Sequence, residues 1–577
     1  MKHWFMPGFL AVIALALALR LPQLSLRPMH NDEAVNAMKF RALWMENNYQ
    51  YDPVEFHGPT LPYFTLPAAW LNASRDFNDF TEATFRVVTV VFGVALIVLL
   101  LLLTPEFGRA ETLWASLFAA LSPAMVFYSR YYIHEMLLVF FTALTAMAWW
   151  RYCKSGRFGW CVLAGAGLGL MWATKETFVF AVLSMALAVI CTAVWTRWCG
   201  GARCSLTEET EGCTTVAQVS KPAVSPTSKS AGQAFVECAG FETRDTDLEV
   251  CATARCRPSR RLGLKSMVAA LGIAVVVAMF FYSSFSKNLA GVTGAFKTYG
   301  LWLHRAGGVS PHEHPWNFYF ERLLFYRANG GPVWSEGLIA GLAAVGFAAG
   351  LAGRCLGPAS VALVRIIAFY TVWMTLIYTA LPYKTPWCML GFWHGMILLA
   401  GVGAAALARM CKPPRLKVGM AVLLAAAAAQ LGRQAWRESF AVDKGGVPYC
   451  DSAKSPHAYS QTAPDIFRLM RTVEGLARVS PAGHGTVIEV MSPDSYWPLP
   501  WYLRRFKAVG FWDKIPAQPP APIMIVSTAL RARFDEGPEK THLMAGYFEL
   551  RPNVFFELYV SADLWAGYIK TAPTEKD

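Results

Sequence analysis

Residues 87–103 read VVTVVFGVALIVLLLLL, and residues 267–282 read MVAALGIAVVVAMFFY. Neither stretch contains a charged side chain, and each approaches the roughly 20 apolar residues that a helix needs to cross the hydrocarbon core of a bilayer. Across all 577 residues, 55% are hydrophobic and only 16% are charged, whereas a soluble protein carries about 25% charged residues. The chain is therefore predicted to be a polytopic α-helical membrane protein, which excludes a soluble enzyme or a disordered protein as a description of the whole.

Eleven apolar segments have the composition of transmembrane helices. They lie near 5–21, 84–103, 112–128, 134–150, 159–175, 177–195, 265–285, 334–353, 362–381, 387–408 and 417–435. A basic start makes the first resemble a signal peptide, but Arg20 follows it in place of a small-residue cleavage site. This favours an uncleaved anchor. Within the fifth segment, Gly165, Gly167 and Gly169 favour close packing between helices.

Lysine and arginine residues set the orientation, because they collect in the cytoplasmic connections of membrane proteins. The basic connections are 151–158, 196–264 and 409–417. Placing them inside leaves 22–83, 286–333 and the tail from 436 on the outer side. Nine of the 13 cysteines then lie inside and only Cys450 lies outside, as expected when one side is reducing. The net charge of +13 has the same source, so no nucleic-acid partner is inferred.

The chain divides into four predicted regions. Residues 1–199 form an N-terminal membrane bundle with a catalytic outer loop at 22–83, and residues 263–435 form a second bundle. Between them, 200–262 is rich in Ser, Thr, Ala and Pro and is predicted to be a disordered cytoplasmic insert. Residues 436–577 are predicted to form a small extracytoplasmic α/β domain, with an amphipathic helix at 464–480. Its expected strands lie at 487–491, 523–526 and 555–560.

Ionisable side chains next to the outer ends of the spans are the candidate functional residues, because charges at a membrane are costly. The set comprises Asp32, Glu33, His57, Arg130, His134, Glu135, Lys175, Glu176, His312, His314 and Lys384. The topology rests on basic loops alone, yet it places the whole set on one face. Purely structural roles are the alternative, namely helix capping for the acids, interfacial anchoring for the cations and turn formation for the histidines.

Carboxylates and cations on one membrane face suit the transfer of a sugar from a polyprenyl phosphate, whose phosphate lies at the bilayer surface. Cations would stabilise the charge that develops on the leaving phosphate, and the candidates are Arg130, Lys175 and Lys384. A carboxylate would take the proton from the acceptor as general base, and the candidates are Asp32, Glu33 and Glu135. The remaining residues are candidates for contacts to substrate or metal: His57, His134, Glu176, His312 and His314. A divalent metal ion is compatible with Asp32, Glu135 and a histidine, although no spacing requires one.

Several ordered motifs carry a family resemblance. Asp32-Glu33 followed by His57-Gly58-Pro59 resembles the first outer loop of the GT-C superfamily of membrane glycosyltransferases, in the branch of the dolichyl-phosphate-mannose–protein mannosyltransferases (glycosyltransferase family 39). Four further motifs are similar to the prokaryotic family of flippase-activity-associated proteins. They are SRYYIHE at 129–135, ATKET at 173–177, PYKTPW at 382–387 and WPLPWY at 497–502.

The resemblance implies an inverting glycosyltransferase, expected to move a hexose, in the cytoplasmic membrane of a prokaryote with its active site facing outside. Its partners would be a polyprenyl-phosphate sugar donor, membrane lipids, and an acceptor glycan, lipid or protein. Asp32 matches the usual base of the family. His-Gly-Pro at 57–59 stands where the family commonly has His-Pro-Pro, which leaves the role of His57 open. The alternative is a non-catalytic or transport role that assists the flipping or export of lipid-linked glycans.

Overall fold

The structure is a computed structural model that describes residues 4–47, 49–54, 57–207, 263–306, 312–536 and 540–571. The chain forms two units, one of Met1–Thr192 with Leu262–Asp577 and the other of Ala193–Arg261. Most of the insert predicted at 200–262 lies outside the described residues. Its first part, up to Thr207, continues a helix that begins at Phe178.

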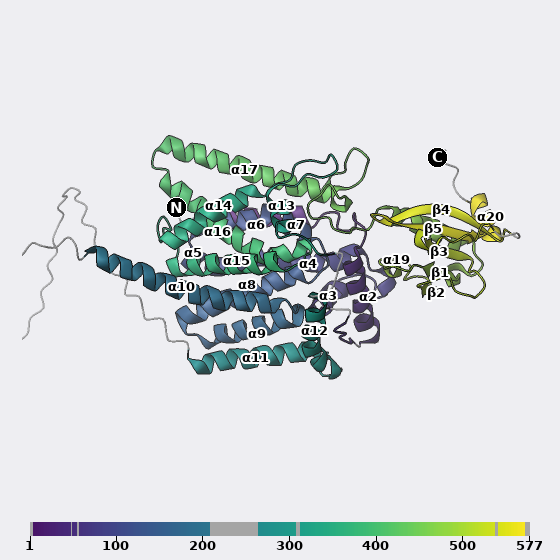
Figure 1. Cartoon of the computed structure of the whole chain (residues 1–577), viewed down its shortest axis with the longest axis horizontal. Helices are drawn as coiled ribbons and strands as arrows, with labels where there is room; N and C mark the ends of the chain where they lie inside the picture. Colours follow the sequence, from purple (N-terminus) through teal and green to yellow (C-terminus); the bar gives the residue numbers. More distant parts are fainter. Residues whose placement is uncertain are drawn as a thin grey trace, which may run out of the picture. The chain divides into compact units, whose positions relative to one another are not determined.

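Helices make up the membrane part of the chain (Figure 1). The N-terminal half contains α1 (Phe5–Arg20), α2 (Asn31–Glu46), α3 (Thr60–Trp70), α4 (Glu82–Leu99), α5 (Thr104–Phe107), α6 (Arg109–Leu121), α7 (Pro123–Ser129), α8 (Glu135–Ser155), α9 (Phe158–Thr174) and α10 (Phe178–Thr207). The second half contains α11 (Leu264–Tyr282), α12 (Ala290–Ala306), α13 (Phe318–Leu324), α14 (Gly337–Ala352), α15 (Val361–Ala380), α16 (Leu390–Met410) and α17 (Pro414–Phe440).

The apolar helices coincide with the predicted spans. In the described part of the chain, seven helices are long and apolar enough to cross a membrane, and α6 with α7 make an eighth if this pair, bent by 61°, counts as one span. The shorter apolar helices α1, α9 and α14 occupy the other three predicted positions. The class of polytopic helical membrane protein is confirmed, whereas the count of eleven spans stays a prediction because three helices are shorter than a bilayer core requires.

Glycines let α9 approach its two neighbours closely, and α8, α9 and α11 run side by side in Figure 1. A Cβ atom at Gly165 would lie 2.6 Å from the carbonyl oxygen of Ala270 in α11, and one at Gly169 would lie 2.5 Å from that of Ala274. Gly167 faces α8 instead. The three glycines therefore have the packing role that their spacing predicts.

The C-terminal region is a small α/β domain with more strands than expected. It contains α18 (Asp465–Val479), β1 (Ile488–Met491), α19 (Leu499–Tyr502), β2 (Val509–Trp512), β3 (Ile523–Ser527), β4 (His542–Arg551), β5 (Val554–Ser561) and α20 (Ala562–Thr571). The sheet order is β2-β1-β3-β5-β4, with β1 parallel to β2 and β3 and with β5 antiparallel to β3 and β4. The predicted helix and three strands are confirmed. Strands β2 and β4 were not predicted. β2 has only four residues, and the exposed positions of β4 do not alternate cleanly with buried ones.

Candidate functional site

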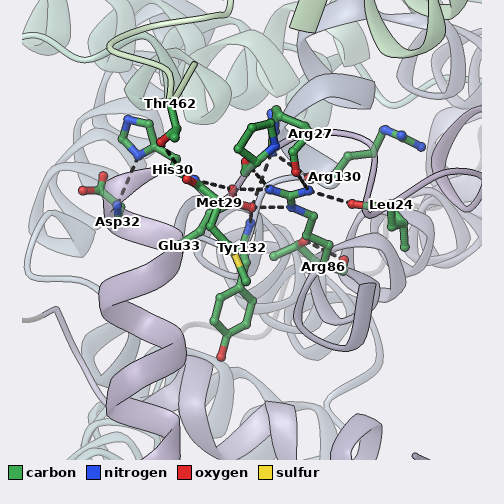
Figure 2. Close-up of polar contacts among 12 residues, drawn as sticks. Leu24, Arg27, Met29, His30, Asp32, Glu33, Arg86, Arg130, Tyr132 and Thr462 are labelled. Carbon is green, nitrogen blue, oxygen red and sulfur yellow. Dashed lines mark hydrogen bonds and ion pairs between the residues drawn. The ribbon is translucent and has the colours of Figure 1, made fainter. Parts of the chain in front are cut away.

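A reciprocal cap fixes the start of α2. The His30 Nδ1 atom accepts a hydrogen bond of 3.1 Å from the backbone N–H of Asp32, and Glu33 accepts one of 3.0 Å from the backbone N–H of His30. Both acids lie in the first turn, where the helix dipole favours negative charge. This cap sends two neighbouring carboxylates in different directions, and Figure 2 shows the Asp32 side chain pointing away from the arginines that surround Glu33.

Glu33 is fully buried in a cluster of cations. The Arg86 guanidinium donates to both of its oxygens at 2.7 and 2.6 Å, and the backbone N–H of Tyr132 donates at 2.9 Å. Arg27 adds a longer contact of 3.4 Å. Burial by itself would raise the pKa of Glu33, but the two guanidinium groups outweigh it and lower the pKa to about 2. Glu33 is therefore a charged anchor of this loop at neutral pH.

Asp32 differs from Glu33 in its burial and in its contacts. Its side chain is exposed. Within the described part of the chain, its carboxylate has no hydrogen-bond or ion-pair partner. The helix start therefore holds Asp32 in place while its carboxylate takes no part in the described contacts.

His312, His314 and Tyr459 form a hydrogen-bonded cluster, and His312 lies near enough to Asp32 to interact with its charge. The Tyr459 hydroxyl lies 2.9 Å from His312 Nδ1 and 2.8 Å from His314 Nε2. Burial lowers the pKa of His312, and the nearby Asp32 carboxylate acts in the opposite direction. The Lys384 ammonium donates to the carbonyl oxygens of His314, at 3.0 Å, and of Leu381. These contacts bring the predicted residues at 312, 314 and 384 together, and His312 interacts electrostatically with Asp32.

Lys175 lies at the break between α9 and α10, as its position in an apolar stretch predicts. Its ammonium forms an ion pair with Glu135 at the start of α8, and both side chains are buried. The pair lines a narrow cavity of about 20 Å³, which has room for about one water molecule. The other walls are mostly apolar side chains of α8, α10, α15 and α16. The ion pair is therefore the charged part of a small cavity with mostly apolar walls.

The His57-Gly58-Pro59 motif packs against the same break. His57 Nδ1 lies 3.1 Å from Glu176 Oε2, and His134 Nε2 lies 3.0 Å from the Gly58 carbonyl oxygen. The Gly58 N–H donates to the Thr174 carbonyl at 3.1 Å. A Cβ at Gly58 would collide with the carbonyl of the residue before Thr174. The departure from His-Pro-Pro is therefore explained, since a proline could neither donate this bond nor fit.

Comparisons with known proteins agree with this architecture. The family model of dolichyl-phosphate-mannose-protein mannosyltransferases matches residues 67–202, while no curated protein matches the sequence. Among solved structures, ArnT from Cupriavidus metallidurans bound to undecaprenyl phosphate is similar, with a TM-score of 0.58 and 14% identity over 96% of this chain and 98% of that one. Apo ArnT gives 0.55 and 13% over the same shares. The chain has the GT-C glycosyltransferase fold.

Arg130, one of the predicted phosphate ligands, binds backbone carbonyl groups. The Arg130 guanidinium donates to the carbonyl oxygens of Arg20, Pro22 and Gln23 at 2.9, 2.7 and 3.2 Å. It lines a small cavity with Arg27 and Arg86, separate from the one beside Lys175. In the structure Arg130 fixes the turn after α1 and keeps little capacity for a ligand.

The predicted metal ligands do not converge. Within the described residues, no group of three or more His, Cys, Asp or Glu side chains is arranged to hold a metal ion. Glu135 pairs with Lys175, and Asp32 is exposed beside His312. These residues therefore do not fit a shared ion.

Two residues of the candidate site, Arg86 and Tyr459, are not among those predicted from the sequence. Arg86 lies just inside the predicted span at 84–103, where a charge is a detectable signal. Besides Glu33, it binds the carbonyl oxygens of Leu24, Arg27 and Pro28 at 2.6–2.8 Å. Tyr459 comes from an irregular segment between α17 and α18, and nothing in its sequence surroundings points to the site.

Proposed function

We propose that this protein is a glycosyltransferase that moves a sugar, expected to be a hexose, from a polyprenyl-phosphate donor to an acceptor on the extracytoplasmic face of a prokaryotic cytoplasmic membrane. The observation that carries the proposal is the pair of neighbouring acids at the start of α2. Glu33 is locked in a buried arginine cluster, while Asp32 is exposed beside His312 with its carboxylate unused by the described residues. The GT-C fold and the mannosyltransferase match support the same class of reaction.

Asp32 would act as the general base. It takes the proton from the acceptor group, whose freed electron pair attacks the anomeric carbon from the side opposite the phosphate. The bond between that carbon and the phosphate oxygen breaks, and the polyprenyl phosphate leaves with the bonding electrons. Because attack and departure occur on opposite faces, the product has inverted configuration.

Lys175 and Lys384 would bind the donor phosphate. Lys175 is a buried cation among mostly apolar side chains, and it would stabilise the negative charge of a phosphate that reached it. An ammonium has three donors, so Lys175 can exchange or share its bond to Glu135 when a phosphate arrives. Lys384 is held by two carbonyl oxygens, one of them that of His314, and would bring positive charge to the cluster that contains His312. In ArnT the structure holds undecaprenyl phosphate, which supports a donor of this class here.

The test compares Asp32→Asn and Lys175→Met with the wild-type protein in nanodiscs. The donor is an undecaprenyl-phosphate-linked hexose, and the readouts are donor binding and the release of undecaprenyl phosphate in the presence of membrane acceptors. Asp32→Asn should lower turnover about 10²- to 10⁴-fold with donor binding nearly unchanged. Lys175→Met should lower turnover and should also weaken donor binding about tenfold to a hundredfold.

Glu46→Gln is the matched control, because Glu46 is an exposed acid at the other end of α2. It should behave as the wild type does. Wild-type turnover by Asp32→Asn would refute the base assignment. If neither variant changed binding or turnover, the enzymatic reading would give way to the non-catalytic role in flipping lipid-linked glycans.

A further inference from the structure

A groove away from the candidate site lies between the beginning of α14 and the last turns of α17. Its volume is about 490 Å³, within the range of small-molecule binding sites. Its lining is Pro332, Val333, Ser335, Leu338, Ala427, Gln430, Leu431, Arg433, Gln434 and Arg437. Apolar walls and two arginines in one groove are the features that a ligand with both a hydrocarbon part and an anionic part requires.

The two arginines lack acidic partners. Arg433 donates to the Gln430 side chain at 3.0 Å, and Arg437 donates to the Tyr449 hydroxyl at 2.9 Å. Among the ion pairs of the described residues, neither guanidinium has a carboxylate. They are four positions apart on one helix, so both face the same side of α17. Two uncompensated guanidinium groups next to each other favour an anion with several oxygens.

The position of the groove along α17 places it near the membrane surface. α17 qualifies as a membrane span, and only 17% of its most apolar window is buried in the protein. Arg433 and Arg437 lie in its last two turns, and Trp436 between them is 54% exposed. Exposed tryptophans of membrane helices mark the level of the lipid headgroups. The guanidinium groups therefore lie at the height of the phosphates of surrounding lipids.

The groove is also held in shape. The Gln434 side chain accepts from the backbone N–H of Ser335 at 2.8 Å and donates to the Ser335 carbonyl at 3.0 Å. This two-way bond ties α17 to the segment before α14. An arginine that only snorkels from an isolated helix would not need a neighbouring segment held against that helix.

We propose that this groove binds an anionic phospholipid of the surrounding leaflet, with its phosphate on Arg433 and Arg437 and an acyl chain along Val333, Leu338 and Leu431. Phospholipid is the committed occupant because α17 qualifies as a membrane span whose most apolar window is mostly unburied, and phospholipids are in large excess around such a helix. The proposal does not rest on the proposed function, because binding is measured without turnover.

The experiment is native mass spectrometry of the full chain in detergent, with added phosphatidylglycerol, phosphatidylcholine or undecaprenyl phosphate. The wild type should retain phosphatidylglycerol in preference to zwitterionic phosphatidylcholine. Arg433→Gln with Arg437→Gln should weaken phosphatidylglycerol binding about thirtyfold. Arg471→Gln with Arg478→Gln is the matched control, since it removes two exposed arginines from α18, and it should leave binding unchanged.

A second variant keeps the charges and fills the space. Ala427→Trp places a large side chain in the groove and should also reduce phosphatidylglycerol binding, which covers the case in which the double variant fails to fold. Unchanged binding in Ala427→Trp or in the folded double variant would overturn the site. Retention of undecaprenyl phosphate in place of phosphatidylglycerol would overturn the proposed occupant.

Discussion

Asp32 and Glu33 show how neighbouring residues of one chemical type acquire different properties. The helix start places Glu33 between Arg86 and Arg27 and leaves Asp32 outside the cluster. Burying a carboxylate costs several kcal/mol unless cations and hydrogen bonds compensate it, and Glu33 has both. Its charge is therefore part of the fold, whereas the charge of Asp32 remains available for chemistry.

Removing the buried charge should destabilise the protein. Glu33→Gln leaves Arg86 buried without its carboxylate, which we expect to lower the free energy of unfolding by about 3–5 kcal/mol at pH 7. Thermal unfolding of purified protein in detergent measures this loss. Asp32→Asn is the matched control one residue away, and its unfolding temperature should stay close to that of the wild type. Equal effects of the two substitutions would contradict the distinction between them.

The pH dependence of stability follows from the same carboxylate. Its folded pKa of about 2 lies below its ordinary value of about 4.3. The stabilisation is therefore complete above about pH 4.3 and is lost as the pH falls through about 2. The wild type should lose stability across this interval, and Glu33→Gln should lack that component.

At the scale of elements, the break between α9 and α10 organises the site. Lys175 and Glu176 interrupt the apolar run, the His57 loop packs on the break, and α8 supplies Glu135 to the ion pair. The position of α9 depends in turn on its glycines, because backbone atoms of α11 occupy the space that side chains would need. Helix packing and site geometry are thus coupled.

A larger residue at the contact between α9 and α11 should disturb both the helix packing and the geometry of the site. Gly169→Val places methyl groups against the Ala274 carbonyl and Val277, and overpacking of this kind costs about 1–3 kcal/mol. Gly272→Val in α11 is the matched control, because a Cβ there meets nothing within 4 Å. Unfolding temperature in detergent is the measurement. The packing account fails if both substitutions have the same effect.

At the scale of the whole molecule, distant segments complete the loop that carries Asp32. The backbone N–H of Met29 donates to the Tyr502 hydroxyl at 2.8 Å, and the Thr462 hydroxyl donates to the Met29 carbonyl at 2.7 Å. Trp501 donates to Glu82 at 3.2 Å. The C-terminal domain therefore contributes to the shape of the N-terminal loop.

The insert, by contrast, should be dispensable. Ala193–Arg261 forms a unit of its own, and its composition is too poor in large apolar residues to build a core. Deleting 208–255 should leave the unfolding temperature, donor binding and turnover close to those of the full chain, measured on the same purified preparations. Loss of donor binding in a well-folded deletion would show that the segment takes part in the site.

Local sequence determined the membrane class, the positions of the apolar helices, the break at Lys175-Glu176 and the amphipathic α18. Each of these depends on the apolar content of one stretch of chain or on the periodic spacing of apolar residues within it. Only the tertiary structure decided that Glu33 is an anchor and Asp32 is exposed, that Arg130 binds backbone carbonyls, and that Tyr459 joins His312 to His314. The physical reason is that desolvation and charge pairing depend on groups brought together from distant segments, such as Glu33 with Arg86, and no local pattern records which partner a buried charge will meet.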